Sequence, residues 1–278
     1  FKKLPGKLPP DKVLVYKTTP QAELKMNIYL PEGWKAGGSL PAIAFWFGGG
    51  YVNGSPTQFF AKAEYFAGRG MVAFCPEYRV KELHGVEKDK CFEDARSGMR
   101  WIRKHAAEYG IDPDRIVAGG GSAGGDLAVS LTYGTGPDAE TDDVSVSTVP
   151  AAMVLFNPAA GSSLPKQTTY RPEEMQRLLA MFSPIANVKK MNVPGIFFYG
   201  TEDHFLPGAV KFINKSRGCG NRCDFWLAEG MPHAFFNASP WHQATTRKAD
   251  EFLVELGFLK GEPTMVVPAG AELKKEVP

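Results

Sequence analysis

The sequence predicts an α/β fold, with one doubly wound, mostly parallel sheet of about eight strands and helices on both faces. Continuous apolar runs of strand length recur along the chain, as at 42–47 and 71–75, and such runs are typical of strands covered on both faces. Segments with helical spacing separate them, the longest at 91–109. With 278 residues, 44% of them hydrophobic, the chain is long enough for one large core, and its length does not require two domains.

The expected elements follow this alternation. Two strands at 13–17 and 24–30, with a turn between them, predict an antiparallel pair at a sheet edge. Further strands are expected at 42–47, 71–75, immediately before Ser122, 152–156, 195–200 and 224–227. Helices are expected at 59–69, 91–109, after Ser122, and at 172–182, 207–216 and 240–256. We therefore expect a single domain over 1–278, in which 1–12 and 262–278 are surface tails and 161–187 is a small insertion over a pocket.

Composition excludes some partners. The formal net charge of +2 gives no reason to expect nucleic acid or an anionic membrane as partner. No apolar run approaches the roughly 20 residues that span a bilayer. Because the sequence begins at Phe1 rather than Met, we expect a mature or trimmed form, secreted or periplasmic, with the cytoplasm as the alternative. Oligomeric state stays open.

The four cysteines do not indicate a metal site. Cys75 and Cys91 lie in apolar patterns and are expected to be small buried hydrophobic residues. Cys219 and Cys223 are close enough in sequence to close a local disulfide in a turn. A zinc site needs further Cys or His ligands at suitable spacing, and none follow. The pairing of these cysteines stays open, and so does the compartment.

The stretch from Gly120 to Gly124 fits G-x-S-x-G, the strand-to-helix turn that exposes a nucleophilic serine. Ser122 is the only polar side chain in this turn. Side chains at Gly120 and Gly124 would collide with the neighbouring strand and helix where the turn is tightest. The pentapeptide alone is weak, because glycine-rich turns with a serine are common in loops. Its place directly after a predicted strand, where α/β sheets bind ligands, strengthens it.

A serine nucleophile needs a histidine base, and the histidine needs a carboxylate. Of the five histidines, His233 stands in the loop between the last predicted strand and the last helix, which favours it as the base. The loop after strand 195–200 supplies Glu202 and Asp203, of which we favour Asp203 because its shorter side chain suits a buried partner. His204 follows this acid directly and is expected to be a neighbour of the site. The remaining histidines are better explained as part of a solvated helix face, a polar loop and a helix cap: His105, His84 and His242.

Three glycines follow strand 42–47 directly, at Gly48, Gly49 and Gly50. Backbone N–H groups there can point into the site without side-chain obstruction, and the N–H of Ala123 follows the nucleophile. These groups are the expected donors to an oxyanion. A phosphate-binding loop is the alternative, but no Lys-Ser/Thr follows the glycines.

At these motifs the chain resembles the α/β-hydrolase superfamily, and within it the hormone-sensitive-lipase-like esterases and bacterial acetyl and feruloyl esterases. The resemblance extends over about 24–259. Its anchors are Phe47 to Tyr51, Glu77-Tyr78-Arg79, Gly110 to Ile116, Gly120 to Gly125, Gly200 to Asp203 and Pro232 to Phe236. These motifs are highly specific for the fold and far less so for the substrate.

The resemblance implies roles for individual residues. Ser122 is then the nucleophile, Asp203 the acid and His233 the base, with Gly49, Gly50 and Ala123 as oxyanion donors and no metal or organic cofactor. Two positions depart from the pattern. Phe47 stands where the lipase-like group has histidine, and Gly121 where it often has aspartate. Neither removes a member of the triad, and both favour the carbohydrate-esterase branch.

The sequence thus predicts a serine esterase that hydrolyses short-chain carboxylic esters, with acetyl or feruloyl groups on plant polysaccharides as the expected substrates. Two alternatives stay open. A prolyl-oligopeptidase-like serine peptidase shares the catalytic fold, although 278 residues leave no room for the extra propeller domain usual there. A non-catalytic binding module usually loses the serine or histidine, whereas here all three triad candidates are present.

Overall fold

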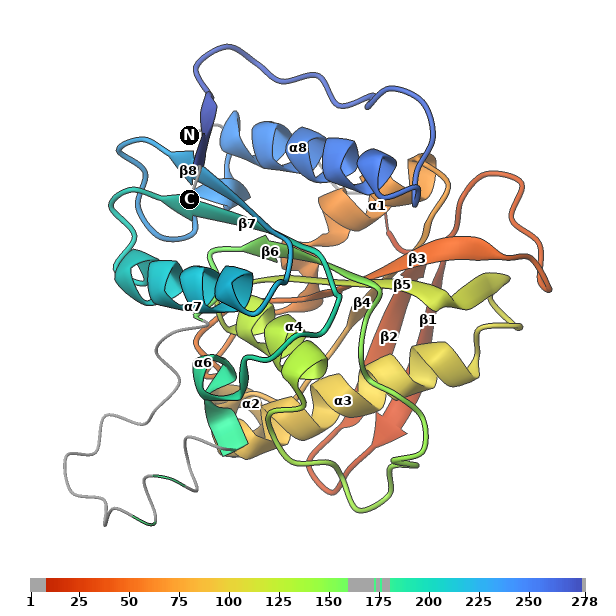
Figure 1. Cartoon of the computed structure of the whole chain (residues 1–278). Coiled ribbons are helices and arrows are strands. Elements are labelled where there is room, and N and C mark those ends of the chain that lie inside the picture. The colour runs from red at the N-terminus through yellow and green to blue at the C-terminus, as the bar shows by residue number, and fades with distance from the viewer. Residues whose placement is uncertain (1–8, 160–172, 174–175, 177–180, 277–278) are drawn as a thin grey trace.

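A mixed sheet of nine strands runs through the middle of the computed structural model, which describes residues 9–159, 173, 176 and 181–276 (Figure 1). Its strand order is β1-β2-β4-β3-β5-β6-β7-β8-β9. The strands are β1 (Lys12–Thr18), β2 (Glu23–Tyr29), β3 (Leu40–Trp46), β4 (Val72–Pro76), β5 (Ile111–Gly121), β6 (Ala152–Phe156), β7 (Gly195–Gly200), β8 (Cys223–Ala228) and β9 (Leu273–Glu276). Pairing from β4 across to β8 is parallel, whereas β1, β2 and β9 join antiparallel at the two edges.

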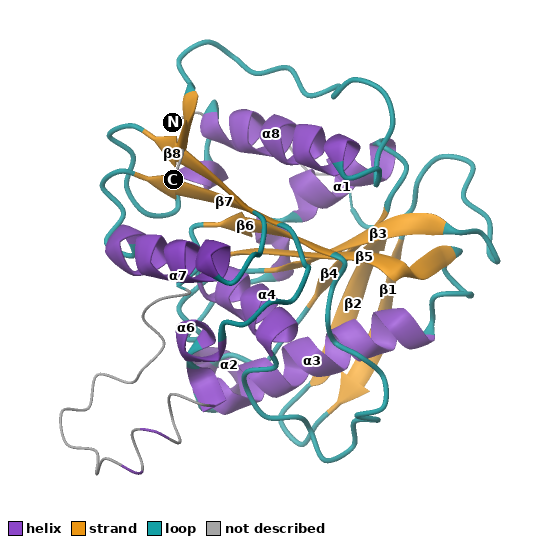
Figure 2. Cartoon of the chain, viewed as in Figure 1, coloured by secondary structure: helices purple, strands orange, loops and turns teal. Residues whose placement is uncertain are grey.

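Helices cover both faces of this sheet, α1 and α8 on one side and α3, α4 and α7 on the other (Figure 2). The described helices are α1 (Phe60–Gly68), α2 (Lys81–His84), α3 (Lys88–Lys104), α4 (Ala123–Tyr133), α6 (Pro184–Asn187), α7 (Leu206–Gly218) and α8 (Trp241–Glu255), with short 3₁₀ turns η1 (Pro56–Gln58) and η2 (Phe235–Asn237). Because both faces are covered, every residue of β4, β6 and β7 is buried, which explains their unbroken apolar sequences. Within the described residues no helix is long and apolar enough to cross a membrane.

The predicted fold class is confirmed, and so is the antiparallel pair at the edge. The number of strands differs, since a ninth strand, β9, lies inside 262–278, which was expected to be a surface tail. Three of its four residues are charged and exposed, as is common on edge strands, so no apolar pattern could reveal it. Most of the expected helix at 172–182 and of the expected insertion at 161–187 lies outside the described residues.

The four cysteines are free thiols, so the structure contains no disulfide between Cys219 and Cys223. Cys75 and Cys91 are buried as expected. Burial raises the pKa of the Cys91 thiol to about 12, and this thiol donates to the carbonyl oxygen of Arg79 at 3.1 Å. Cys91 therefore behaves as a small core residue and not as a reactive thiol.

Parallel pairing places the carboxyl ends of β3, β5, β6, β7 and β8 along one edge of the sheet. Chain segments that leave these ends are where α/β sheets assemble ligand sites. Gly48 follows β3, Ser122 follows β5, Asn157 follows β6, Asp203 follows β7 and His233 lies in the loop after β8.

Candidate active site

Ser122 occupies a strained turn between β5 and α4. Its backbone has φ 52° and ψ −121°, a combination that costs a non-glycine residue of order 1–3 kcal/mol. The Ser122 N–H donates to the carbonyl oxygen of Phe156 at 3.0 Å, which ties the turn to β6. A Cβ at Gly120 would collide with the carbonyl of Gly124, and one at Gly124 with the carbonyl of Trp46 in β3. Both glycines are therefore required by close backbone approach.

Hydrogen bonds connect Ser122 to His233, and His233 to Asp203. The Nε2 atom of His233 lies 2.9 Å from the Ser122 Oγ atom, and its Nδ1 atom lies 2.8 Å from Asp203 Oδ2. The Asp203 side chain is fully buried and that of His233 is 22% exposed. Asp203 Oδ1 accepts the N–H of Phe205 at 2.8 Å, which fixes the carboxylate plane. The structure thus brings together three side chains that lie far apart in the sequence.

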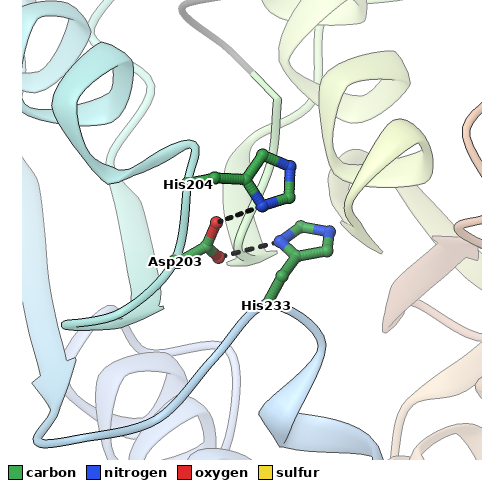
Figure 3. Close-up of side chains that lie close together, drawn as sticks. All are labelled: Asp203, His204 and His233. Atoms are coloured by element: carbon green, nitrogen blue, oxygen red, sulfur yellow. Dashed lines mark hydrogen bonds and ion pairs between the residues drawn. The ribbon is translucent and has the colours of Figure 1, made fainter.

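The two neighbours of Asp203 differ from it in exposure and direction. Glu202 is exposed, whereas Asp203 is buried against His233. His204 lies beside the site as expected, with its ring centroid 5.0 Å from that of His233 and its Nδ1 atom 3.9 Å from Asp203 Oδ1. Figure 3 shows the carboxylate of Asp203 facing both imidazole rings. The other histidines do not join this group: His105 stacks on Trp101, His84 bonds to Val80, and His242 is buried in α8.

The glycine loop after β3 turns sharply next to the serine. Gly49 and Gly50 have φ of 131° and 64°, which L side chains rarely adopt. Gly48 lies so close to Ser122 that a Cβ there would be 3.2 Å from the serine Cβ. Its N–H donates to Gln58 Oε1 at 2.6 Å, whereas the N–H groups of Gly49 and Gly50 have no acceptor among the described residues. The N–H of Ala123 begins α4, where no intrahelical acceptor exists.

A buried side-chain contact, which the sequence did not predict, joins this loop to the first turn of α4. The Tyr51 hydroxyl donates to Asp126 Oδ2 at 2.5 Å, and Lys88 Nζ lies 3.9 Å from the same oxygen. Burial raises the pKa of the Asp126 carboxyl, and the charge of Lys88 opposes that rise. Tyr51 itself has a positive φ of 67°. The bond therefore holds a strained residue directly after Gly50, and the only sequence signal was polar residues inside two glycine motifs.

Asn157 was also missed. It follows β6, is fully buried, and its Oδ1 atom accepts the N–H of Ala234 at 3.2 Å. Its Nδ2 atom lies 3.4 Å from His233 Nε2. Asn157 thus holds the loop that carries the histidine. Its position in the sequence, as a polar residue directly after a buried strand, could have indicated it. The same kind of position indicates Ser122 and Asp203.

The two departures from the lipase-like pattern are explained by aromatic packing. A Cβ at Gly121 would collide with the ring of Phe236. This ring, three positions after His233, therefore occupies the space that a side chain at position 121 would need. Phe47 stacks on Tyr78 with ring centroids 4.1 Å apart, and the Tyr78 hydroxyl donates to the Phe47 carbonyl at 2.7 Å. These contacts secure the end of β3 without a histidine.

Ser122 lies in a strained turn after a central parallel strand, and a histidine and a buried carboxylate follow later strands. This arrangement is characteristic of α/β-hydrolases that use a serine. The chain belongs to the α/β-hydrolase superfamily, among its serine esterases.

The family model described as BD-FAE matches residues 26–149. Among solved structures, the chain is 41% identical to the propionate-bound thermophilic esterase Est2 of Thermogutta terrifontis, with a TM-score of 0.81 over 90% of this chain and 96% of that one. The paraoxon-phosphorylated form of esterase 2 from the same organism gives 40% identity and a TM-score of 0.83 over 90% and 96%. A probable isoprenylcysteine alpha-carbonyl methylesterase of Oryza sativa subsp. japonica is 28% identical, over 77% of this chain and 55% of that protein. The chain spans about half the length of this curated relative.

Proposed function

We propose that this chain is a serine esterase that hydrolyses short-chain carboxylic esters, with Ser122 as nucleophile, His233 as base and Asp203 as acid. The observation that carries the proposal is the continuous pair of hydrogen bonds through His233. Its Nε2 atom lies 2.9 Å from Ser122 Oγ and its Nδ1 atom 2.8 Å from Asp203 Oδ2. The similar esterase Est2 has been solved with propionate bound, which supports a short acyl group.

The first step is acylation of the serine. Because Asp203 accepts from Nδ1–H, the neutral imidazole of His233 has its free lone pair at Nε2, facing Ser122 Oγ. The hydroxyl proton passes to Nε2 as Oγ bonds to the ester carbonyl carbon. The imidazolium formed is stabilised by the buried carboxylate of Asp203 and then protonates the leaving alcohol. Water repeats the sequence on the acyl-enzyme, which releases the carboxylic acid and restores the serine.

Negative charge on the carbonyl oxygen needs donors that are already aimed at it. In the proposal these are the N–H groups of Gly49, Gly50 and Ala123, of which the two loop glycines have no acceptor among the described residues. One such donor is worth roughly 10²- to 10³-fold in rate. Hydrogen bonds from Gly48 to Gln58 and from Tyr51 to Asp126 keep this loop, and with it the donors of Gly49 and Gly50, in place before the substrate arrives.

We further propose that the ester lies on a plant polysaccharide, as an acetyl or a feruloyl group. Support comes from the departures at Phe47 and Gly121, which distinguish the chain from the lipase-like pattern, and from the partial exposure of Ser122 and His233 to solvent. A bulky alcohol portion requires a site that solvent reaches.

A substrate panel tests the proposed function. We expect turnover of p-nitrophenyl acetate and propionate, a decline with longer acyl chains, and release of acetate from acetylated xylan or of ferulate from methyl ferulate. A peptide amide substrate provides the comparison with a peptidase. Cleavage of the amide but of no ester would contradict an esterase. Hydrolysis of the p-nitrophenyl esters alone, with neither acetylated xylan nor methyl ferulate cleaved, would contradict the polysaccharide substrate.

The contact between Tyr51 and Asp126 leads to a separate prediction. Tyr51→Phe is expected to lower kcat for p-nitrophenyl acetate about tenfold with little change in KM, because the oxyanion donors are needed mainly in the transition state. It also leaves a buried carboxylate oxygen without its donor, at a cost of about 1–3 kcal/mol in the free energy of unfolding. Steady-state kinetics and thermal denaturation measure the two effects.

The matched control is Tyr65→Phe. Tyr65 also donates to a buried aspartate, Asp250 of α8, but this pair joins α1 to α8 on the face of the sheet opposite α4. We expect Tyr65→Phe to lower the melting temperature and leave kcat near wild type. If both variants reduced kcat equally, the effect of Tyr51→Phe would be one of stability and not of loop position.

A further inference from the structure

We propose that Asp203, His204 and His233 form an inhibitory zinc site, in which a bound Zn²⁺ switches off the base of the proposed reaction. The three residues offer one carboxylate oxygen and two imidazole nitrogens that all lie within 4.8 Å of one another. Two histidines and a carboxylate are a ligand set that zinc prefers, with a remaining position for water. Zinc binding does not depend on the proposed function, whereas inhibition by zinc rests on the proposed function.

Only small shifts are needed to bind zinc: the contact between His233 and Asp203 has to lengthen, and His204 has to move closer. Ligand atoms around tetrahedral zinc are roughly 3.3 Å apart, since each bond to the metal is about 2.0–2.2 Å long. In the structure the Nδ1 atom of His233 is 2.8 Å from Asp203 Oδ2, and that of His204 is 3.9 Å from Oδ1. Figure 3 shows both nitrogens turned toward the carboxylate.

The three proposed ligands differ in how freely their side chains can move. The Asp203 side chain is fully buried and held by the N–H of Phe205, so it is the fixed ligand. The His204 side chain is 67% exposed, which lets it turn toward the metal and gives the ion a path from solvent. A cation beside this buried carboxylate also gains more from charge attraction than one at an open surface.

Metal binding at Nδ1 changes the tautomer of His233. A neutral imidazole carries one proton, which here is on Nδ1 and donated to Asp203. When Zn²⁺ takes the Nδ1 lone pair, that proton moves to Nε2, so no net proton is lost from the ring. Nε2–H then faces Ser122 Oγ and can no longer accept the hydroxyl proton. Zinc therefore inhibits the enzyme and does not serve as its cofactor.

The test is calorimetric titration of the full chain with ZnCl₂ in a non-coordinating buffer, together with ester hydrolysis at the same zinc concentrations. We expect one zinc per chain, inhibition that follows occupancy, and reversal by a chelator. His204→Ala should weaken zinc binding at least about tenfold and raise the inhibitory concentration in proportion, with each variant compared with its own zinc-free rate.

Two controls separate this site from other zinc ligands. Glu202→Gln alters the adjacent exposed charge without removing a proposed ligand, and Cys219→Ser removes a partly exposed free thiol. Both should bind zinc at this site as the wild type does. Absence of binding at millimolar zinc, or equal affinity in His204→Ala and wild type, would overturn the proposal. Because calorimetry needs no turnover, a failure of the zinc site is distinguishable from a failure of the esterase function.

Discussion

Ser122→Ala is expected to lower kcat/KM for p-nitrophenyl acetate by at least about 10⁴-fold, because no other group could then form the acyl-enzyme. Ser122 is the one hydroxyl in contact with His233 Nε2 among the described residues, at 2.9 Å. The measurement is steady-state hydrolysis with a circular dichroism spectrum to verify folding. Residual hydrolysis would reflect the remaining donors and the histidine acting on water.

Ser130→Ala provides the matched control. Ser130 lies in α4, two turns beyond Ser122, and its hydroxyl donates only within the helix, to the Leu127 carbonyl at 2.6 Å. We expect this variant to lose about 1 kcal/mol of stability and to keep its activity. Unchanged turnover in Ser122→Ala would contradict the assignment of the nucleophile, whatever the behaviour of the control.

Asp203→Asn is expected to lower kcat by roughly 10⁴-fold. The N–H of Phe205 donates to Oδ1, so the asparagine would turn its carbonyl oxygen toward Phe205 and its NH₂ toward His233. The imidazole would then accept at Nδ1 and carry its proton on Nε2, the tautomer that cannot accept from Ser122. Loss of the negative charge also removes stabilisation of the imidazolium. Steady-state kinetics on p-nitrophenyl acetate measure the loss.

Glu202→Gln is the comparison for that variant, since it neutralises an adjacent carboxylate that is exposed and takes no part in the hydrogen bonds between Ser122, His233 and Asp203. Activity should stay within about twofold of wild type, because an exposed charge is well screened by water. If Glu202→Gln were the damaging change and Asp203→Asn a mild one, the acid would be assigned wrongly.

Much of the fold could be predicted because its signals are local. Buried parallel strands such as β6 and β7 read as unbroken apolar runs, and their bounds agree with the expected 152–156 and 195–200. The strand β9 could not be predicted, because its charged residues are held by pairing with β8 and not by burial. The segment Asp112-Pro113-Asp114-Arg115 predicts a turn into the strand before Ser122, yet β5 already begins at Ile111. An irregular register between β5 and β3 accommodates this segment within the strand.

The site could be predicted to the extent that its residues follow strands. Ser122, Asp203 and His233 stand after predicted strands, and their order along the chain is enough to propose that they meet. Contacts between residues of separate motifs could not be predicted in this way. Neither the bond from Tyr51 to Asp126 nor the one from Ala234 to Asn157 has a pattern of its own in the sequence. They depend on how the loops turn after leaving the sheet, where Tyr51, Asn157 and Ala234 all have a positive φ.

The most direct test of the central claim is covalent labelling with a fluorophosphonate, followed by peptide mass spectrometry. An activated serine attacks the phosphorus and stays modified, so we expect one adduct per chain, on Ser122. His233→Ala should slow the labelling by several orders of magnitude, because the serine then lacks its base. An unmodified Ser122, or an adduct on a different residue in a chain that still hydrolyses esters, would contradict the account.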